Sequence, residues 1–204
     1  HFERGETDIL VGTQMVSKGL DFPKVGLVGV MNADLFLHQP DFRASERAFQ
    51  LLSHIAGRAG RKEQGRVLIQ TYNPFQETLQ RIQQGEYTAM MTAQLTERSD
   101  FHYPPYYRLV RIIFRHRELE RINQAGQWFA DGLRTGLAGY PVEVLGAEFP
   151  PISRIRNEYI KHILLKIAPK VPLPMVKDYI LRLEQSFYST ALFRPVILSY
   201  NVDP

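Results

Sequence analysis

Two adjacent prolines, Pro104 and Pro105, interrupt the chain near its middle and separate two segments with different residue patterns. Proline has no backbone N–H and a fixed φ, so a helix cannot continue through this pair. The 204 residues of the chain are enough for one large domain or two small ones. We therefore expect a first domain at 1–82, a helical linker at 83–105 and a second domain at 106–204.

Short apolar runs alternate with helical patterns in the first segment, which is typical of an α/β domain with a parallel sheet. The expected elements are, in order, a strand at 9–12, a strand at 25–31, a helix at about 43–57 and a strand at 66–72. Residues 74–98 are then expected to be helical, because their apolar residues recur at roughly helical spacing. The pattern predicts part of a doubly wound α/β lobe.

The second segment begins with an alternating run at 108–116, which places Ile112 and Phe114 on one face of a strand and Arg111 and Arg115 on the other. The remaining expected elements are a helix at about 118–138, strands at 142–145 and 159–168, a helix at about 173–188 and a strand at 195–202. The resulting order, β-α-β-β-α-β, predicts an α+β domain of the ferredoxin-like type.

A glycine-arginine repeat, Ala56-Gly-Arg-Ala-Gly-Arg61, follows the expected helix at 43–57. The planar, permanently charged side chains of Arg58 and Arg61 suit the grip on a phosphoryl group that gains charge, as in an arginine finger. The chain has no G-x-x-x-x-G-K-[ST] loop to cradle the nucleotide phosphates. For the motif alone, a helix C-cap with cations on the helix dipole remains an equal alternative.

Polar residues also follow the first expected strand, where open α/β sheets place their ligand chemistry. Thr13 and Gln14 are candidates to hydrogen-bond nucleic-acid phosphates, and Lys18 is a candidate to pair with one. Gly19 and Asp21 are candidates for a nucleotide site, in which Asp21 accepts from a ribose hydroxyl or orients an arginine. The alternative is a surface loop with a glycine-containing turn.

In the second segment a basic and aromatic surface is expected instead of a catalytic site. Arginine and tyrosine on sheet faces and loops can hold phosphates and stack on unpaired bases. The candidate DNA-binding residues there are Arg111, Arg115, Arg154, Arg156, Tyr159 and Lys161. A solvated charged face is the alternative, and the nearby glutamates at 118, 120 and 158 support it.

Composition agrees with a nucleic-acid partner, because the formal net charge is +4. The absence of cysteine argues against a disulfide framework and a zinc site, and the six histidines fall at no metal-ligand spacing. The sequence shows no signal peptide and no long apolar span. We therefore expect a cytoplasmic protein with no metal site and no membrane partner.

Several stretches resemble motifs V and VI in the second RecA-like lobe of superfamily 2 helicases, and more closely the primosomal protein N′ (PriA) family of replication-restart helicases. These stretches are Thr13-Gln-Met-Val-Ser-Lys-Gly-Leu-Asp-Phe-Pro23, Asn32-Ala-Asp34, Pro40-Asp-Phe-Arg-Ala-Ser-Glu-Arg47, Ala56-Gly-Arg-Ala-Gly-Arg61 and Tyr103-Pro-Pro-Tyr-Tyr-Arg108. The run from Leu145 to Tyr159 is similar to the entry of the family's C-terminal domain. Departures from the family pattern are His54 in place of the usual Gln, and Asn157 and Lys161 in place of Gly and Arg.

The resemblance implies that 1–82 is the C-terminal part of a second RecA-like lobe and that 106–204 is a domain for DNA or partner binding. It implies a longer protein that unwinds DNA 3′ to 5′ with ATP and Mg²⁺, restarts stalled forks and assembles the primosome. Arg58 and Arg61 would be the catalytic residues and would contact ATP held elsewhere. A cysteine-rich zinc insertion is expected upstream of residue 1.

The partners implied are branched and single-stranded DNA, single-strand binding protein and primosome proteins. For this chain alone we expect DNA binding and no ATP hydrolysis. Two alternatives stay open: a non-catalytic nucleic-acid-binding module, and a platform for single-strand binding protein and primosome proteins.

Overall fold

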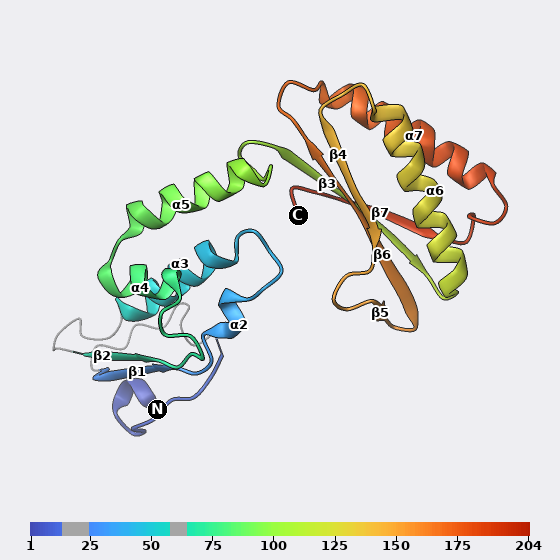
Figure 1. Cartoon of the computed structure of the whole chain (residues 1–204). Coiled ribbons are helices and arrows are strands. Elements are labelled where there is room, and N and C mark those ends of the chain that lie inside the picture. Colours follow the sequence, from blue (N-terminus) through green and yellow to red (C-terminus); the bar gives the residue numbers. More distant parts are fainter. Residues whose placement is uncertain (14–24, 58–64) are drawn as a thin grey trace. The chain divides into compact units, whose positions relative to one another are not determined.

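The computed structural model of the protein describes residues 1–13, 25–57 and 65–204, and it divides into two compact units (Figure 1). The first unit is His1–Thr96 and the second is Glu97–Pro204. The segment expected as a linker, 83–105, is shared between the two units.

The first unit contains a two-stranded parallel sheet, in which β1 (Leu27–Val30) pairs with β2 (Arg66–Ile69). Its core is formed by Val30 of β1 together with helix residues such as Leu52 and Leu79. The helices of this unit are the short 3-10 helix η1 (Phe2–Arg4), α2 (Asp34–Leu37), α3 (Ala44–Ala56), α4 (Glu77–Gln84) and α5 (Tyr87–Asp100), the last of which continues into the second unit.

Helix α3 lies within one residue of the helix expected at 43–57. Its buried residues Ala44, Ala48 and Leu52 recur every four residues, so one stripe of the helix faces the core. Before its first turn the carboxylate of Asp41 accepts a hydrogen bond from the backbone N–H of Arg43 at 2.9 Å. The sequence therefore contains both the apolar stripe and the local polar contact that begin this helix.

The buried strand expected at 9–12 is wrong, because residues 9–12 are irregular in the structure. Ile9 and Val11 have exposed fractions of 79% and 86%. An extended segment becomes a strand only when a neighbouring strand pairs with its backbone groups. Within the described residues β1 pairs with β2 alone, and no strand pairs with 9–12.

The single helical segment expected at 74–98 is also wrong in part, since the structure has two helices, α4 and α5, in this region. Gly85 separates them and has a φ of 71°, the left-handed conformation that commonly ends a helix. At the other end of α4, the side chain of Gln76 accepts a hydrogen bond from the backbone N–H of Leu79 at 3.1 Å. Both ends of α4 are therefore capped by its own sequence.

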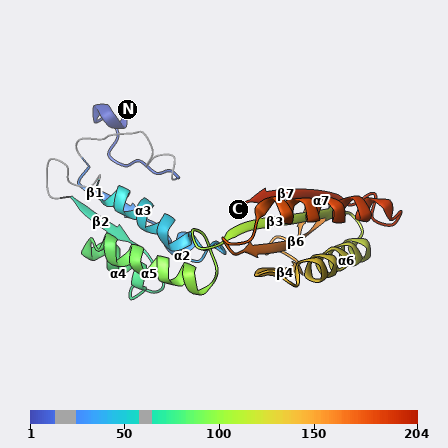
Figure 2. The ribbon, with the colours of Figure 1, turned by 90° about the horizontal axis from the view of Figure 1, so that it is seen from above.

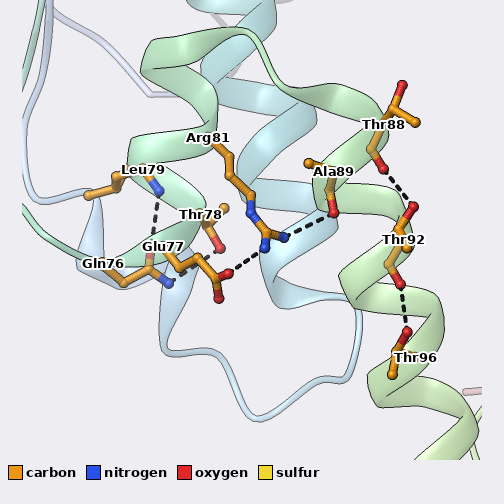
Figure 3. Close-up of polar contacts among 9 residues, drawn as sticks. All are labelled: Gln76, Glu77, Thr78, Leu79, Arg81, Thr88, Ala89, Thr92 and Thr96. Atoms are coloured by element: carbon orange, nitrogen blue, oxygen red, sulfur yellow. Dashed lines mark hydrogen bonds and ion pairs between the residues drawn. The ribbon is translucent and has the colours of Figure 1, made fainter.

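Arg81 bridges the corner between the two helices (Figure 3). It pairs with Glu77 in its own helix and donates to the backbone oxygen of Ala89 in α5 at 3.1 Å. Farther along α5, the hydroxyl of Thr92 donates to the backbone oxygen of Thr88 at 3.0 Å. The contacts of Arg81 hold the two helices together at the bend, which apolar spacing alone does not reveal.

The second unit is built on an antiparallel sheet with the strand order β4-β6-β3-β7, and a short strand β5 extends it by pairing with β6. Its strands are β3 (Arg108–His116), β4 (Val142–Glu148), β5 (Arg154–Ile155), β6 (Glu158–Ile167) and β7 (Ile197–Val202). In Figure 2, β7 lies beside β3 and β4 forms the opposite edge. The strands predicted at 108–116, 142–145, 159–168 and 195–202 are present, and β5 is an addition to that pattern.

Helices α6 (Leu119–Leu137) and α7 (Leu173–Ser189) pack on one face of this sheet and on each other (Figure 1). Their core contains Phe129 of α6 and Phe187 of α7, both fully buried against Phe114 of β3. The other face of the sheet carries the side chains of alternate positions, because successive side chains in a strand point to opposite sides. We call this second side the helix-free face.

The segment after α5 is fixed to one end of the helix-free face. The ammonium of Lys166 in β6 donates to the backbone oxygen of Phe101 at 2.6 Å and lies 3.9 Å from the centre of the Tyr103 ring. His102 pairs with Glu143 of β4, which lies beside Lys166 in the sheet. Burial lowers the pKa of Lys166, and the charge of Glu143 acts in the opposite direction.

Candidate nucleic-acid interface

Two arginines of β3 lie on the helix-free face, as the alternating sequence predicts. Ile112 and Phe114 are fully buried in the core, so Arg111 and Arg115 project to the other side of the sheet. Arg111 is half-buried and Arg115 is exposed. Neither arginine forms an ion pair within the described residues. Both cations are therefore available to an anion from outside.

His162 joins these arginines from the neighbouring strand. In the register of β3 and β6 it lies opposite Ile113, the residue midway between Arg111 and Arg115. Burial lowers the pKa of His162, and the positive charges of the two arginines lower it further. The helix-free face therefore carries a local excess of positive charge around the half-buried imidazole of His162.

Strand β7 adds small polar side chains to the same face. Ser199 lies opposite Ile113, and Asn201 lies opposite Arg111. Hydroxyl and amide groups of this kind donate hydrogen bonds to phosphate oxygens in nucleic-acid interfaces. The combination of two arginines with nearby hydrogen-bond donors suits a phosphate backbone better than it suits a small organic ligand.

A second group of expected residues lies on the hairpin formed by β5 and the start of β6. Arg154 pairs with Tyr159 and Ile155 with Glu158, which leaves Arg156 and Asn157 as a two-residue turn. Both turn residues have positive φ values, 49° and 66°, as a type I′ hairpin turn requires. Glycine and asparagine adopt this conformation easily, so Asn157 suits this turn position.

The side chains of this hairpin form cation–aromatic pairs. The guanidinium carbon of Arg154 lies 4.8 Å from the centre of the Tyr159 ring, and Arg154 also donates to the side-chain oxygen of Asn157. The ammonium of Lys161 lies 4.7 Å from the centre of the Phe149 ring. A cation over an aromatic face is held by the ring quadrupole, so both cations have defined positions.

The structure therefore separates the expected DNA-binding residues of the second unit into two groups. Tyr159 and Lys161 share their side of β6 with the buried Ile163, because they differ from it by even numbers of positions. Lys161 also approaches Gly126 of α6, and burial lowers its pKa. Lys161 is thus on the helix-covered side, whereas Arg111 and Arg115 are on the helix-free face.

Most of the expected nucleotide and DNA contacts of the first unit fall outside the described residues. These are Gln14, Lys18, Gly19, Asp21, Arg58 and Arg61. Thr13 is described and is exposed. His54 is exposed in the last turn of α3, directly before the glycine-arginine repeat.

Asp34, at the carboxyl end of β1, has a structural role. Its carboxylate accepts hydrogen bonds from the backbone N–H of Tyr72 at 3.0 Å and from the hydroxyl of Thr71 at 2.9 Å. The hydrogen bond from Tyr72 is the main cause that lowers the pKa of Asp34. Asp34 therefore ties the segment after β1 to the segment after β2.

Sequence reasoning did not include His162 and Asn157 among the site residues. His162 belongs to the site only through the strand register, which a single sequence does not contain. The local sequence did contain a signal for Asn157, because an Arg-Asn pair between two short β-rich runs is consistent with a type I′ hairpin turn.

No helix in the described ranges has the length and apolar character needed to cross a bilayer.

Two family models match the chain, one in each unit. The model of the helicase conserved C-terminal domain matches residues 1–63. The model of the primosomal protein N C-terminal domain matches residues 99–204. The second match covers the sheet of the second unit, whose strands carry both basic groups, together with helices α6 and α7.

Curated relatives carry the name replication restart protein PriA. The one from Bacillus subtilis (strain 168) is 39% identical over 88% of this chain and 22% of its own length. The one from Synechocystis is 38% identical over 100% of this chain and 24% of its own length, and the one from Chlamydia muridarum is 31% identical over 100% and 26%. This chain spans about a quarter of the length of these relatives. With matches of this extent in both units, the chain belongs to the PriA family of replication restart proteins, a family of helicases.

Proposed function

We propose that this chain is the C-terminal part of an ATP-dependent 3′–5′ DNA helicase that restarts stalled replication forks and assembles the primosome. Within it, the second unit binds DNA through the helix-free face. The observation that carries the DNA-binding proposal is the pair Arg111 and Arg115, which lie on one face without an ion-pair partner in the described part of the chain. Their effect on the pKa of His162 supports a positive potential at this place.

The ferredoxin-like assignment of the second unit is part of the proposal. Its support is the strand order β4-β6-β3-β7 together with two helices on a single face. In that arrangement one face of the sheet is covered and the other stays free for a ligand. The fold thereby explains why charged residues of β3 reach the surface while their neighbours are buried.

The nucleotide part of the proposal rests on the sequence. Arg58 and Arg61 would reach the phosphates of ATP and Mg²⁺ held by another part of the longer protein, and Gly19 and Asp21 would contact the same nucleotide. Thr13, Gln14 and Lys18 would contact the DNA backbone. Zinc belongs to the upstream insertion in this proposal, since the chain contains no cysteine. The expected location is the cytoplasm.

Salt-dependent DNA binding is the test of the helix-free face. Anisotropy titrations of this chain with duplex, forked and single-stranded DNA over a salt series are expected to give an affinity that falls with salt, with a slope of about −0.7 to −0.9 per phosphate contacted. Arg111→Gln with Arg115→Gln should weaken binding to all three and reduce the slope by about 1–2. Arg182→Gln in α7 is the matched control and should leave both unchanged.

The outcome that overturns the proposal is an affinity that does not change with salt, or a double variant that binds as tightly as the original. ATP hydrolysis is a second test. This chain alone should show no turnover above background, and measurable turnover would contradict the assignment of Arg58 and Arg61 to a shared site.

A protein platform is the second candidate function, favoured by one observation. Exposed apolar side chains gather in the segment before the hairpin and in β5, where Phe149, Ile152 and Ile155 have exposed fractions of 40%, 67% and 49%. Exposed apolar groups beside charged ones are typical of protein interfaces. Single-strand binding protein and primosome proteins are the partners proposed for this surface, and salt-independent binding of such a partner would support it.

A further inference from the structure

The β5–β6 hairpin combines three features at one place on the second unit. It has a two-residue turn at its tip, a cation held over an aromatic ring, and no carboxylate on that side. Glu158 pairs with Ile155, so it lies on the opposite side of the hairpin from Arg154 and Tyr159. The hairpin therefore offers a guanidinium that is positioned by its neighbours and not neutralised across the strand.

Two contacts hold the Arg154 guanidinium in place. The ring of Tyr159 lies beneath it at 4.8 Å, and the side-chain oxygen of Asn157 accepts one of its hydrogen bonds. Tyr159 itself packs against the hydrophobic core of the second unit. Because one side of the guanidinium meets this fixed ring and the residue is otherwise exposed, its outer side faces solvent.

Planar guanidinium groups and aromatic rings are surfaces on which unpaired bases stack. In a duplex the base faces are covered by neighbouring bases. A guanidinium or aromatic ring can therefore stack only on bases that have left the base stack. Arg156 at the tip adds a cation next to this surface. Its positive φ is unusual for arginine and is tolerated here by the turn.

We propose that the β5–β6 hairpin binds single-stranded DNA by stacking an unpaired base on the Arg154 guanidinium, which Tyr159 supports and Asn157 orients. This inference rests on the proposed DNA-binding function and specifies which form of DNA the hairpin takes. The helix-free face contacts phosphates of any DNA, whereas the hairpin contacts bases.

A comparison of two oligomers tests the stacking. The chain is titrated at fixed salt with oligodeoxythymidylate and with an abasic oligomer of the same length, which has the same phosphates and no bases. The ratio of the two dissociation constants should be at least about fivefold in favour of the thymidylate, because a stacked base contributes about 1–3 kcal/mol. Arg154→Lys keeps the charge but not the plane, so it should bring the ratio close to one and leave abasic binding unchanged.

Asn157 provides a test of positioning. Asn157→Gly keeps a residue that adopts positive φ but removes the oxygen that accepts from Arg154, so the ratio should fall. Asn157→Asp restores an accepting oxygen and should restore the ratio, even where the added negative charge weakens binding to both oligomers. Arg182→Lys, an exposed arginine in α7, is the matched control and should change neither constant.

The outcomes separate this inference from the proposed function. If neither oligomer binds in a salt-dependent way, both proposals are overturned. If both oligomers bind equally well, or if Arg154→Lys keeps the original ratio, the stacking site is overturned and the phosphate-binding face stands. A ratio that depends on Arg154 and on the accepting oxygen at position 157 supports the stacking site.

Discussion

The pKa of His162 responds to the positive charge on the helix-free face. Burial and the charges of Arg111 and Arg115 lower its pKa below the ordinary value of 6.5, so the free protein holds a neutral imidazole at neutral pH. A phosphate bound by the two arginines adds negative charge beside the ring, which favours the charged imidazolium and raises the pKa. The complex therefore binds more protons than the free protein does.

We predict from this difference that DNA affinity rises as pH falls through the interval between the two pKa values of His162. Titrations between about pH 5 and pH 8 measure it. His162→Gln should remove the pH dependence while keeping most of the affinity at the upper end. Glu148 lies opposite His162 in β4, so Glu148→Gln is the control and should keep the pH dependence. A profile shared by both proteins would contradict the role of His162.

The same shift affects folding stability with a definite sign. Below the unfolded pKa of histidine, the unfolded chain binds the proton more readily than the folded chain does, because the folded pKa of His162 is lowered. The contribution of His162 to stability is therefore present above about pH 6.5 and is lost as pH falls from there through the lower folded pKa of His162. This change is independent of DNA and is measured on the free protein.

The backbone conformation of Arg156 lowers the stability of the folded protein. Its φ of 49° places an arginine in a left-handed turn position that asparagine adopts more easily. We predict that Arg156→Asn raises the free energy of unfolding by about 1 kcal/mol, seen as a higher urea midpoint with an unchanged slope. Arg117→Asn, in the turn after β3 where φ is not positive, is the control and should change it little. Equal midpoints for the two variants would exclude strain at Arg156.

What the sequence predicts about single residues depends on what fixes their orientation. The alternation at 108–116 was enough to place Arg111 and Arg115 opposite the buried Ile112 and Phe114, since a strand has a strict period of two. The grouping of Lys161 with those arginines was not supported in the same way. Lys161 lies two positions from the buried Ile163 in β6, so its side chain is on the helix-covered side. His162 required the pairing of β3 with β6, which no local pattern contains.

At the scale of elements, the helices with a buried stripe were predicted well and the segments that depend on a partner were not. Helices α3, α6 and α7 end within one residue of their expected bounds, because apolar spacing and core packing act together there. The segment 9–12 has the composition of a buried strand but no neighbour in the described residues. The break at Gly85 was missed because the apolar spacing continues on both sides of it.

Helices α6 and α7 approach closely at two glycines of α6. A Cβ on Gly136 would lie 1.9 Å from the ring carbon Cζ of Tyr179, and the hydroxyl of Tyr179 donates to the backbone oxygen of Gly132 at 2.6 Å. Alanine in a helix is usually more favourable than glycine by about 1 kcal/mol. Here it displaces a packed ring and its hydrogen bond, which costs about 1–3 kcal/mol.

We predict that Gly136→Ala lowers the free energy of unfolding by about 1 kcal/mol, measured by urea unfolding. The double-mutant cycle with Tyr179→Ala gives the control, since Gly136→Ala should become stabilising once the ring is absent. A Gly136→Ala variant that is more stable in the original background would show that Tyr179 moves aside without cost. The cycle thus separates helix propensity from packing between the two helices.

At the scale of the whole molecule, the two units differ in how completely they bury their apolar residues. The second unit has a core in which Phe114, Phe129 and Phe187 are fully buried. In the first unit, Leu27 and Leu68 of the two-stranded sheet have exposed fractions of 58% and 61%. A two-stranded sheet is marginally stable without further cover. The sequence predicted two domains from Pro104 and Pro105. How completely each unit buries its apolar residues depends on which strands pair, and the sequence alone does not show this.

We predict that the two units unfold in separate steps, with the first unit unfolding at the lower urea concentration. The protein contains one tryptophan, Trp128, which lies in α6 and packs against Phe187. Its fluorescence therefore reports the second unit alone, whereas far-ultraviolet circular dichroism reports the helices and strands of both. The fluorescence midpoint should be higher than the midpoint of the first dichroism step, since two-state unfolding requires that all probes coincide.

A shorter chain, Glu97–Pro204, provides the control for this prediction. It should keep the fluorescence midpoint of the full chain, because the core around Trp128 is made of residues from the second unit. Coincident transitions for both probes would show instead that the units unfold as one. In that case the shorter chain would lose its fluorescence midpoint, and the stability of the second unit would depend on the first unit.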